Sequence, residues 1–75
     1  MPGYREFRFY SPQLDTEAAR LSMVDGQGRE YFAVIDAGSG RGYRERREAA
    51  LSRIEDAIMA GEPPGEVARA PLDAH

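Results

Sequence analysis

Hydrophobic and polar side chains alternate along residues 4–10, YREFRFY. A period of two residues is typical of a β-strand with one buried face. The alternation sorts the side chains into two sets: Arg5, Phe7 and Phe9 on one face, and Tyr4, Glu6, Arg8 and Tyr10 on the other. The next stretch, SPQLDTE, contains Pro and Asp and predicts a loop.

A second pair of strands is predicted around a glycine-rich turn. Residues 18–25, AARLSMVD, lead into Gly26–Gln27–Gly28, and residues 29–36, REYFAVID, return with aromatic and β-branched side chains. A helix over DTEAARLSMV is the competing interpretation, because Ala, Glu, Arg and Leu favour helices. We favour the hairpin, because the returning strand needs a partner.

The length of this turn decides which side chains share a face. A two-residue tip at Gly26 and Gln27 predicts two sets: Leu21, Phe32 and Val34 on one face, and Val24, Tyr31 and Ile35 on the other. A longer, bulged turn shifts the register by one residue and exchanges the faces. In both registers the returning strand is apolar on both sides.

Residues 43–60, YRERREAALSRIEDAIMA, predict an amphipathic helix. Apolar side chains recur at spacings of three and four residues: Ala50, Leu51, Ile54, Ala57 and Ile58. Gly61, followed by Pro63 and Pro64, predicts the end of the helix, since glycine suits the left-handed cap and proline cannot continue a helix.

The segment after the helix, GEPPGEVARAPLDAH, is rich in Pro, Gly and acidic residues. It predicts a tail that docks in part through Val67 and frays beyond about Ala70. We therefore predict an α+β fold, with a three-stranded antiparallel sheet in β-β-β-α order, one amphipathic helix on one face and a Pro-rich C-terminal tail. Residues 1–61 form the single domain, and residues 62–75 form the partly docked or disordered tail.

One helix covers only one face of such a sheet, so some apolar side chains should stay uncovered. The candidates are Tyr4, Tyr10, Val24, Tyr31 and Ile35. An exposed apolar patch rimmed by Glu6, Arg8 and Arg29 is typical of a protein interface or a homodimer face. The alternative is that the tail folds back over this patch.

Composition limits the chemistry of the chain. Its 75 residues include no cysteine and one histidine, His75, so a thiolate or histidine metal site and a histidine base are not expected. The four serines have no histidine or lysine to activate them. No segment approaches the roughly 20 apolar residues of a membrane span, and the opening residues do not resemble a secretory signal. We expect a soluble, cytoplasmic non-enzyme without a cofactor or metal.

The chain has a net charge of −3, and this charge is unevenly distributed along it. Residues 1–40 carry −2, residues 41–53 carry +3 and residues 54–75 carry −4. The acidic total disfavours general binding to nucleic acid, and the acidic parts suit a basic protein surface. A nucleic-acid-binding module remains an alternative, through a basic patch at the start of the helix: Arg41, Tyr43, Arg44, Arg46 and Arg47.

The stretch AVIDAGSGRGYR, residues 33–44, resembles the first motif of Rossmann-like methyltransferases: an apolar strand, an acid and then glycines at alternate positions. That family also requires a second strand with an acid near its end, and further parallel strands. We expect no such strand after the helix, so the glycines predict a corner between strand and helix. An anion held by the amides of this turn with Arg41 and Arg44 is the alternative.

The stretch YFAVID, a glycine turn and then EAALSRIEDAI resemble the strand, loop and helix of HicB-type antitoxins. This resemblance implies an antitoxin or small regulatory protein that binds a toxin.

The whole chain, from PGYREFRFY through YFAVIDAGSGRGYRERREAA to GEPPGEV, is similar to small phage-encoded anti-CRISPR proteins directed at type I-C systems. The resemblance implies binding to the backbone subunit of the Cascade complex in the cytoplasm of a bacterial host, so that target DNA is not recruited. Acidic side chains would occupy a basic DNA groove. The predicted partner-binding residues are Glu6, Tyr10, Asp15, Glu17, Tyr31, Glu55, Asp56 and Glu62.

Overall fold

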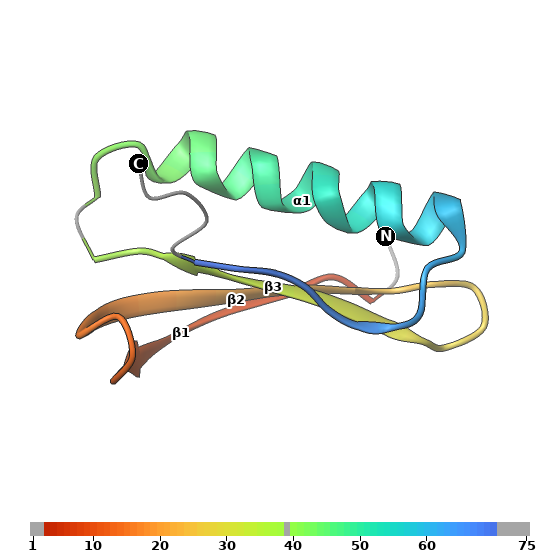
Figure 1. Cartoon of the computed structure of the whole chain (residues 1–75), viewed down its shortest axis with the longest axis horizontal. Helices are drawn as coiled ribbons and strands as arrows, with labels where there is room; N and C mark the ends of the chain where they lie inside the picture. The colour runs from red at the N-terminus through yellow and green to blue at the C-terminus, as the bar shows by residue number, and fades with distance from the viewer. Residues whose placement is uncertain (1–2, 39, 71–75) are drawn as a thin grey trace.

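A computed structural model describes residues 3–38 and 40–70. Its elements are β1 (Arg5–Ser11), β2 (Thr16–Val24), β3 (Glu30–Asp36), α1 (Tyr43–Ala60) and β4 (Gly65–Arg69). The four strands form one sheet in the order β1-β2-β3-β4. The first three strands are antiparallel, and β4 runs parallel to β3. Figure 1 shows α1 lying along one face of the sheet.

The α+β class is confirmed, but the three-stranded antiparallel sheet was wrong because Gly65–Arg69, within the predicted tail, is a fourth strand. Pro63 and Pro64 end the helical path and favour extended backbone. After α1 has run back along the sheet, the chain that follows must run parallel to β3. A strand at the edge also tolerates nearby prolines, so the composition of this segment concealed it.

The segment that had a competing helical interpretation is strand β2. It lies between β1 and β3 and pairs with both. Its alternate side chains Ala19 and Leu21 are fully buried under α1. Pairing on both sides and burial of one face outweigh the local helix propensity of Ala, Glu and Arg.

The turn between β2 and β3 takes the longer, bulged form. Val24 pairs with Glu30 rather than Arg29, so the register is shifted by one residue from that of a two-residue tip. The Asp25 N–H donates to the Arg29 carbonyl (2.9 Å), and the Gly28 N–H donates to the Asp25 carbonyl (3.1 Å). Gly28 has φ 84°, the left-handed residue that a three-residue loop with a bulge requires. Leu21, Tyr31 and Ile35 therefore face α1.

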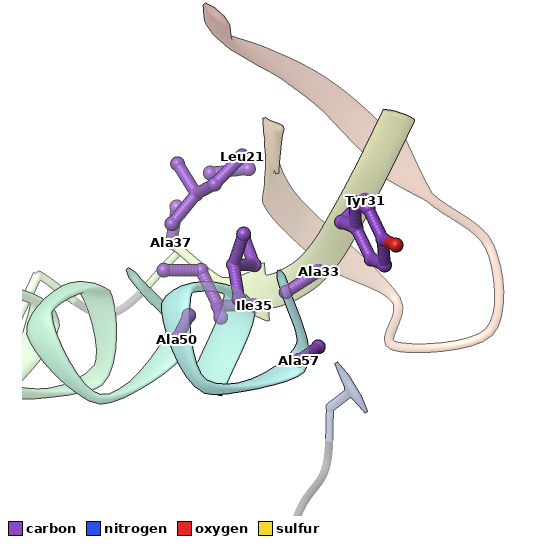
Figure 2. Packing of buried hydrophobic residues seen from close by; sticks show 9 residues of the cluster. Leu21, Tyr31, Ala33, Ile35, Ala37, Ala50 and Ala57 are labelled. Carbon is purple, nitrogen blue, oxygen red and sulfur yellow. The ribbon is translucent and has the colours of Figure 1, made fainter. Parts of the chain in front are cut away.

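The core between α1 and the sheet is built largely from alanine. Ala50 and Ala57 of the helix face the sheet residues Ala33 and Ile35, as Figure 2 shows. Ile54 of the helix is also fully buried. The other two large members of the predicted helix stripe, Leu51 and Ile58, are half-buried at its margins and pack against the core. Small side chains in the centre let the helix lie close to the strands.

The bounds predicted for the helix are confirmed. It follows Gly42, with φ 75°, and ends at Gly61, with φ 69°. The N–H groups of Gly61 and Glu62 donate to the carbonyls of Ile58 (3.2 Å) and Ala57 (3.0 Å), which satisfies the last turn. Within residues 3–38 and 40–70, no helix combines the length and the apolar character that crossing a membrane takes.

Candidate functional site

The face of the sheet opposite α1 differs from the predicted patch. Tyr31 and Ile35, expected among the uncovered residues, are 0% and 1% exposed, because the bulged turn directs them beneath the helix. The face opposite α1 instead carries three phenylalanines on β1 and β3, the two strands that flank β2: Phe7, Phe9 and Phe32. Phe7 is 51% exposed.

Two predicted partner-binding residues act within the fold. The Tyr31 hydroxyl donates to the Glu62 carbonyl at 2.9 Å, so this buried side chain joins β3 to the segment after α1 and lies beneath the molecular surface. Both carboxylate oxygens of Glu62 accept from Arg53, at 2.9 and 3.0 Å. These hydrogen bonds lower the pKa of Glu62.

Three others gather at the turn between β1 and β2. The exposed Tyr10 hydroxyl donates to the Asp15 carboxylate, and this bond raises the pKa of Tyr10. Asp15 has a left-handed backbone, with φ 56°. Glu17 lies 3.8 Å from Arg8. These acids are therefore on the sheet and its loop, away from the outer face of the helix.

Glu6 is the centre of a polar cluster between β1 and α1, which we call the Glu6 cluster; it comprises Tyr4, Glu6, Arg8, Tyr43 and Arg47. The hydroxyls of Tyr4 and Tyr43 each donate to the Glu6 carboxylate at 2.7 Å. Arg47 donates to Glu6 at 3.0 Å and to the Tyr4 hydroxyl at 3.0 Å. The Arg8 guanidinium lies 4.8 Å from the centre of the Tyr43 ring.

These contacts shift the ionisation of the cluster. Partial burial acts to raise the pKa of Glu6, but hydrogen bonds from Tyr4, Tyr43 and Arg47 outweigh it and hold that pKa below its ordinary value. Burial, reinforced by the Glu6 charge, raises the pKa of both Tyr4 and Tyr43. Glu6 is therefore a charged group that fastens β1 to the helix.

In the predicted basic patch, the side chains of Tyr43, Arg46 and Arg47 make hydrogen bonds within the fold. Arg46 donates from Nε to the Asp36 carbonyl at 2.9 Å and from Nη1 to the Arg41 carbonyl at 2.8 Å. Tyr43 and Arg47 belong to the Glu6 cluster. A nucleic acid bound here would have to replace these contacts. Arg44 is exposed on the first helical turn.

The glycine-rich turn leads from β3 into α1, and the chain after α1 forms β4, which is parallel to β3. Our expectation that no second strand follows the helix was wrong, because β3, α1 and β4 form a crossover. The Asp36 carboxylate accepts the Gly38 N–H at 2.8 Å, and Gly40 has φ 76°. The predicted corner is therefore present, with the acid of the motif used to shape it. β4 ends at Arg69, where the methyltransferase pattern has an acid.

The outer side of α1 carries a surface that we call the acidic face: Glu45, Glu48, Glu55, Asp56 and Met59. All five side chains are exposed, and Met59 is 86% exposed. The four carboxylates make no hydrogen bond or ion pair with any described residue. Glu55 and Asp56 had been predicted as partner-binding residues, whereas Met59 was missed, because one Met at the end of a helical pattern gives no separate signal.

Shallow hollows lie on both sides of Glu55. One is lined by Glu55, Asp56, Ile58 and Met59. The other is lined by Tyr4, Met23, Arg47, Leu51 and Glu55. Each hollow is lined by both apolar side chains and a carboxylate, which suits a protein interface better than an enclosed small-molecule site.

Among residues 3–38 and 40–70, no three His, Asp or Glu side chains are grouped so that they could hold a metal ion. The chain matches no protein-family model, no curated protein and no solved structure.

Proposed function

We propose that this protein is a non-catalytic binding protein whose acidic face docks into a positively charged protein surface that otherwise holds nucleic acid. The observation that carries the proposal is that four exposed carboxylates without a hydrogen bond or salt bridge to the described residues lie on the same side of α1 as the exposed Met59. Because these carboxylates make no hydrogen bond or salt bridge with the described residues, and only Asp56 has a longer-range attraction to Arg53, a cationic surface would gain their charge without breaking a hydrogen bond in the fold.

The dimensions of the acidic face support this role. Glu45 and Asp56 are eleven residues apart in one helix, which corresponds to about 17 Å at roughly 1.5 Å per residue. A DNA strand spans that length in about five nucleotides at about 3.4 Å each. Met59 lies at the end of this row and supplies an apolar anchor beside the charges, and methionine adapts to irregular partner surfaces.

The type I Cascade complex, and its backbone subunit in particular, is the first partner to test, because the chain resembles anti-CRISPR proteins of type I-C systems. A basic groove filled by the acidic face has no room for target DNA. The protein would then act as an inhibitor of DNA recruitment, without any reaction of its own.

The test compares two triple variants of equal charge change. The first, Glu48→Gln/Glu55→Gln/Asp56→Asn, neutralises the acidic face. The control neutralises three acids of the sheet: Glu17→Gln, Glu30→Gln and Glu66→Gln. We expect wild type and control to prevent purified Cascade from shifting target DNA in a gel, and the first variant to need at least about tenfold more protein. The inhibition should also weaken with added salt, since exposed charges are screened.

Equal potency of the two variants would show that the acidic face is not the contact surface. Normal DNA binding by Cascade in a large excess of wild-type protein would exclude the proposed inhibition of DNA recruitment.

A further inference from the structure

Strand β1 is an edge strand that lacks a proline, a glycine and a bulge. In the part of the chain that the structure describes, it pairs only with β2. Its seven residues contain no Pro, Gly or bulge, three features that normally limit pairing at a sheet edge. Charged side chains, another common protection, are present as Arg5, Glu6 and Arg8. By contrast, the opposite edge, β4, has five residues, follows two prolines and pairs with β3 through an irregular register. The outward-facing backbone N–H and C=O groups of β1 therefore make β1, rather than β4, the edge that can accept another strand.

The side chains of β1 also expose hydrophobic surface. The described residues include three exposed large hydrophobic side chains, and two of them, Phe7 and Tyr10, lie on β1. Phe7 points to the face opposite α1, where it contacts Phe9 edge-on with ring centres 6.4 Å apart. An aromatic edge of this kind favours pairing with another strand.

We propose that β1 pairs antiparallel with β1 of a second copy of this chain, about a two-fold axis at Phe7. Phe7 then lies opposite its own copy on the face away from α1. On the helix side, Glu6 lies opposite Arg8 of the second copy, and Arg8 lies opposite Glu6. The pairing joins two four-stranded sheets into one sheet of eight strands.

Charge selects this register. Opposite charges directly across two strands stabilise the pair, and like charges destabilise it. Moving the axis by one residue toward the N-terminus places Glu6 opposite its own copy, and moving it by one residue the other way places Arg8 opposite its own copy. Centring the pair on Phe9 leaves Arg8 opposite Tyr10 and forms no ion pair. The axis at Phe7 therefore gives two complementary ion pairs and one aromatic pair.

The helix leaves room for this arrangement. α1 packs over β3, β4 and β2, and it reaches β1 only through the side chains of the Glu6 cluster. The helix therefore does not block the outer edge of β1. The acidic face is on the far side of α1 from the sheet and stays accessible in the dimer.

The first test measures mass in solution by sedimentation equilibrium or light scattering. Wild type should have twice the 8.3 kDa mass of one chain. Phe7→Lys should be monomeric, because it places two positive charges at the axis. Met59→Lys, which changes another exposed hydrophobic residue by the same charge, should remain dimeric. Circular dichroism checks that both variants are folded.

The second test reads the register directly. The chain has no cysteine, so oxidation of Phe7→Cys should give one disulfide-linked dimer. Directly opposite residues have Cα atoms about 4.5 to 5.5 Å apart, within the range of a disulfide. Phe9→Cys is the matched control on the same face of the same strand. Its two copies would be about 14 Å apart along the strands, so it should not cross-link.

A monomeric wild type at a concentration of about 100 μM, or a dimeric Phe7→Lys, would overturn the proposal. Cross-linking of Phe9→Cys in preference to Phe7→Cys would exclude the register. The dimer and the proposed function are independent: Phe7→Lys tests the first, and the neutralised acidic face tests the second.

Discussion

At the scale of single residues, hydrogen bonds to the Glu6 carboxylate, rather than hydrophobic contacts, join β1 to α1. The side chains that β1 directs toward the helix are polar or charged, whereas β2 and β3 direct Ala, Leu, Ile and Tyr there. Two tyrosine hydroxyls and one guanidinium converge on the Glu6 carboxylate. Hydrogen bonds to a charged group are stronger than neutral ones, so one carboxylate can hold an edge strand that contributes little to the apolar core.

We predict that Glu6→Gln lowers the free energy of unfolding by about 1–3 kcal/mol at neutral pH, since the variant loses hydrogen bonds to a partly buried charge. The pKa of Glu6 lies below its ordinary value of 4.5. A carboxylate of this kind stabilises the fold fully above about pH 4.5, and that contribution is lost as the pH falls through its lower, folded-state pKa. The difference between variant and wild type should therefore narrow below about pH 4.5 in urea unfolding.

Glu17→Gln is the control for this prediction. Glu17 is exposed and pairs with Arg8 at 3.8 Å, a geometry that contributes little to stability. An equal effect of the two substitutions, or a Glu6→Gln deficit that does not narrow as the pH falls below about 4.5, would contradict the role assigned to Glu6.

At the scale of elements, the turn between β2 and β3 decides which side chains form the core. The Asp25 carboxylate accepts the N–H groups of Gln27 and Arg29 at 2.8 and 2.9 Å. The hydrogen bonds of Arg29 and Gln27 lower the pKa of Asp25. These contacts stabilise the longer loop over a two-residue tip. One extra residue in the loop exchanges the faces of β3 relative to β2.

Substitution of two glycines of this turn, Gly28 and Gly26, by alanine is predicted to change the free energy of unfolding by different amounts. Gly28→Ala should lower the free energy of unfolding by about 1–2 kcal/mol, because φ 84° is left-handed and costly for a residue with Cβ. Gly26→Ala should change stability little or raise it slightly, since a Cβ there meets no atom within 4 Å and its φ is not left-handed. Thermal unfolding of the two variants measures both effects. Equal costs would mean that the loop does not have the bulged geometry.

At the scale of the whole molecule, β4 completes the sheet and covers one margin of the core. It extends the sheet beyond β3, and Val67 and Ala68 pack against the core under α1. The buried Tyr31 hydroxyl bonds to the Glu62 carbonyl in the segment that leads into β4. The residues after the helix are therefore part of the folded unit as far as Ala70, whose N–H donates to the Val34 carbonyl at 2.8 Å.

The role of β4 predicts a stability difference between two neighbouring residues. Val67→Asp should lower the free energy of unfolding by about 1–3 kcal/mol, because it introduces a polar group without a partner into the margin of the core. Glu66→Gln changes an exposed residue paired with Arg69 and should have little effect. Urea unfolding of both variants makes the comparison. If Val67→Asp were as stable as wild type, these residues would be a loosely attached tail.

The whole molecule also separates its charges. Among residues 3–38 and 40–70, the face of the sheet opposite α1 has three arginines and three acids: Arg5, Arg20, Arg69, Glu30, Asp36 and Glu66. The acidic face of α1, by contrast, carries four acids. The proposed contact with a basic partner uses the outer side of α1, whereas the proposed contact between two copies uses the edge of the sheet at β1, so both can form in one assembly.

The sequence by itself determined the elements whose signal is local. Period-two alternation predicted β1, spacings of three and four predicted α1 with its buried stripe, and Gly61 predicted its end; the structure has all of these. Tertiary structure alone decided three other features. The register of β3 against β2 depends on one residue of loop length. Residues 65–69 form a strand because they pair with β3. Glu6 contacts Tyr43 and Arg47 only when β1 and α1 are packed together. Local patterns reflect propensity and amphipathicity, whereas pairings between distant segments depend on the rest of the fold.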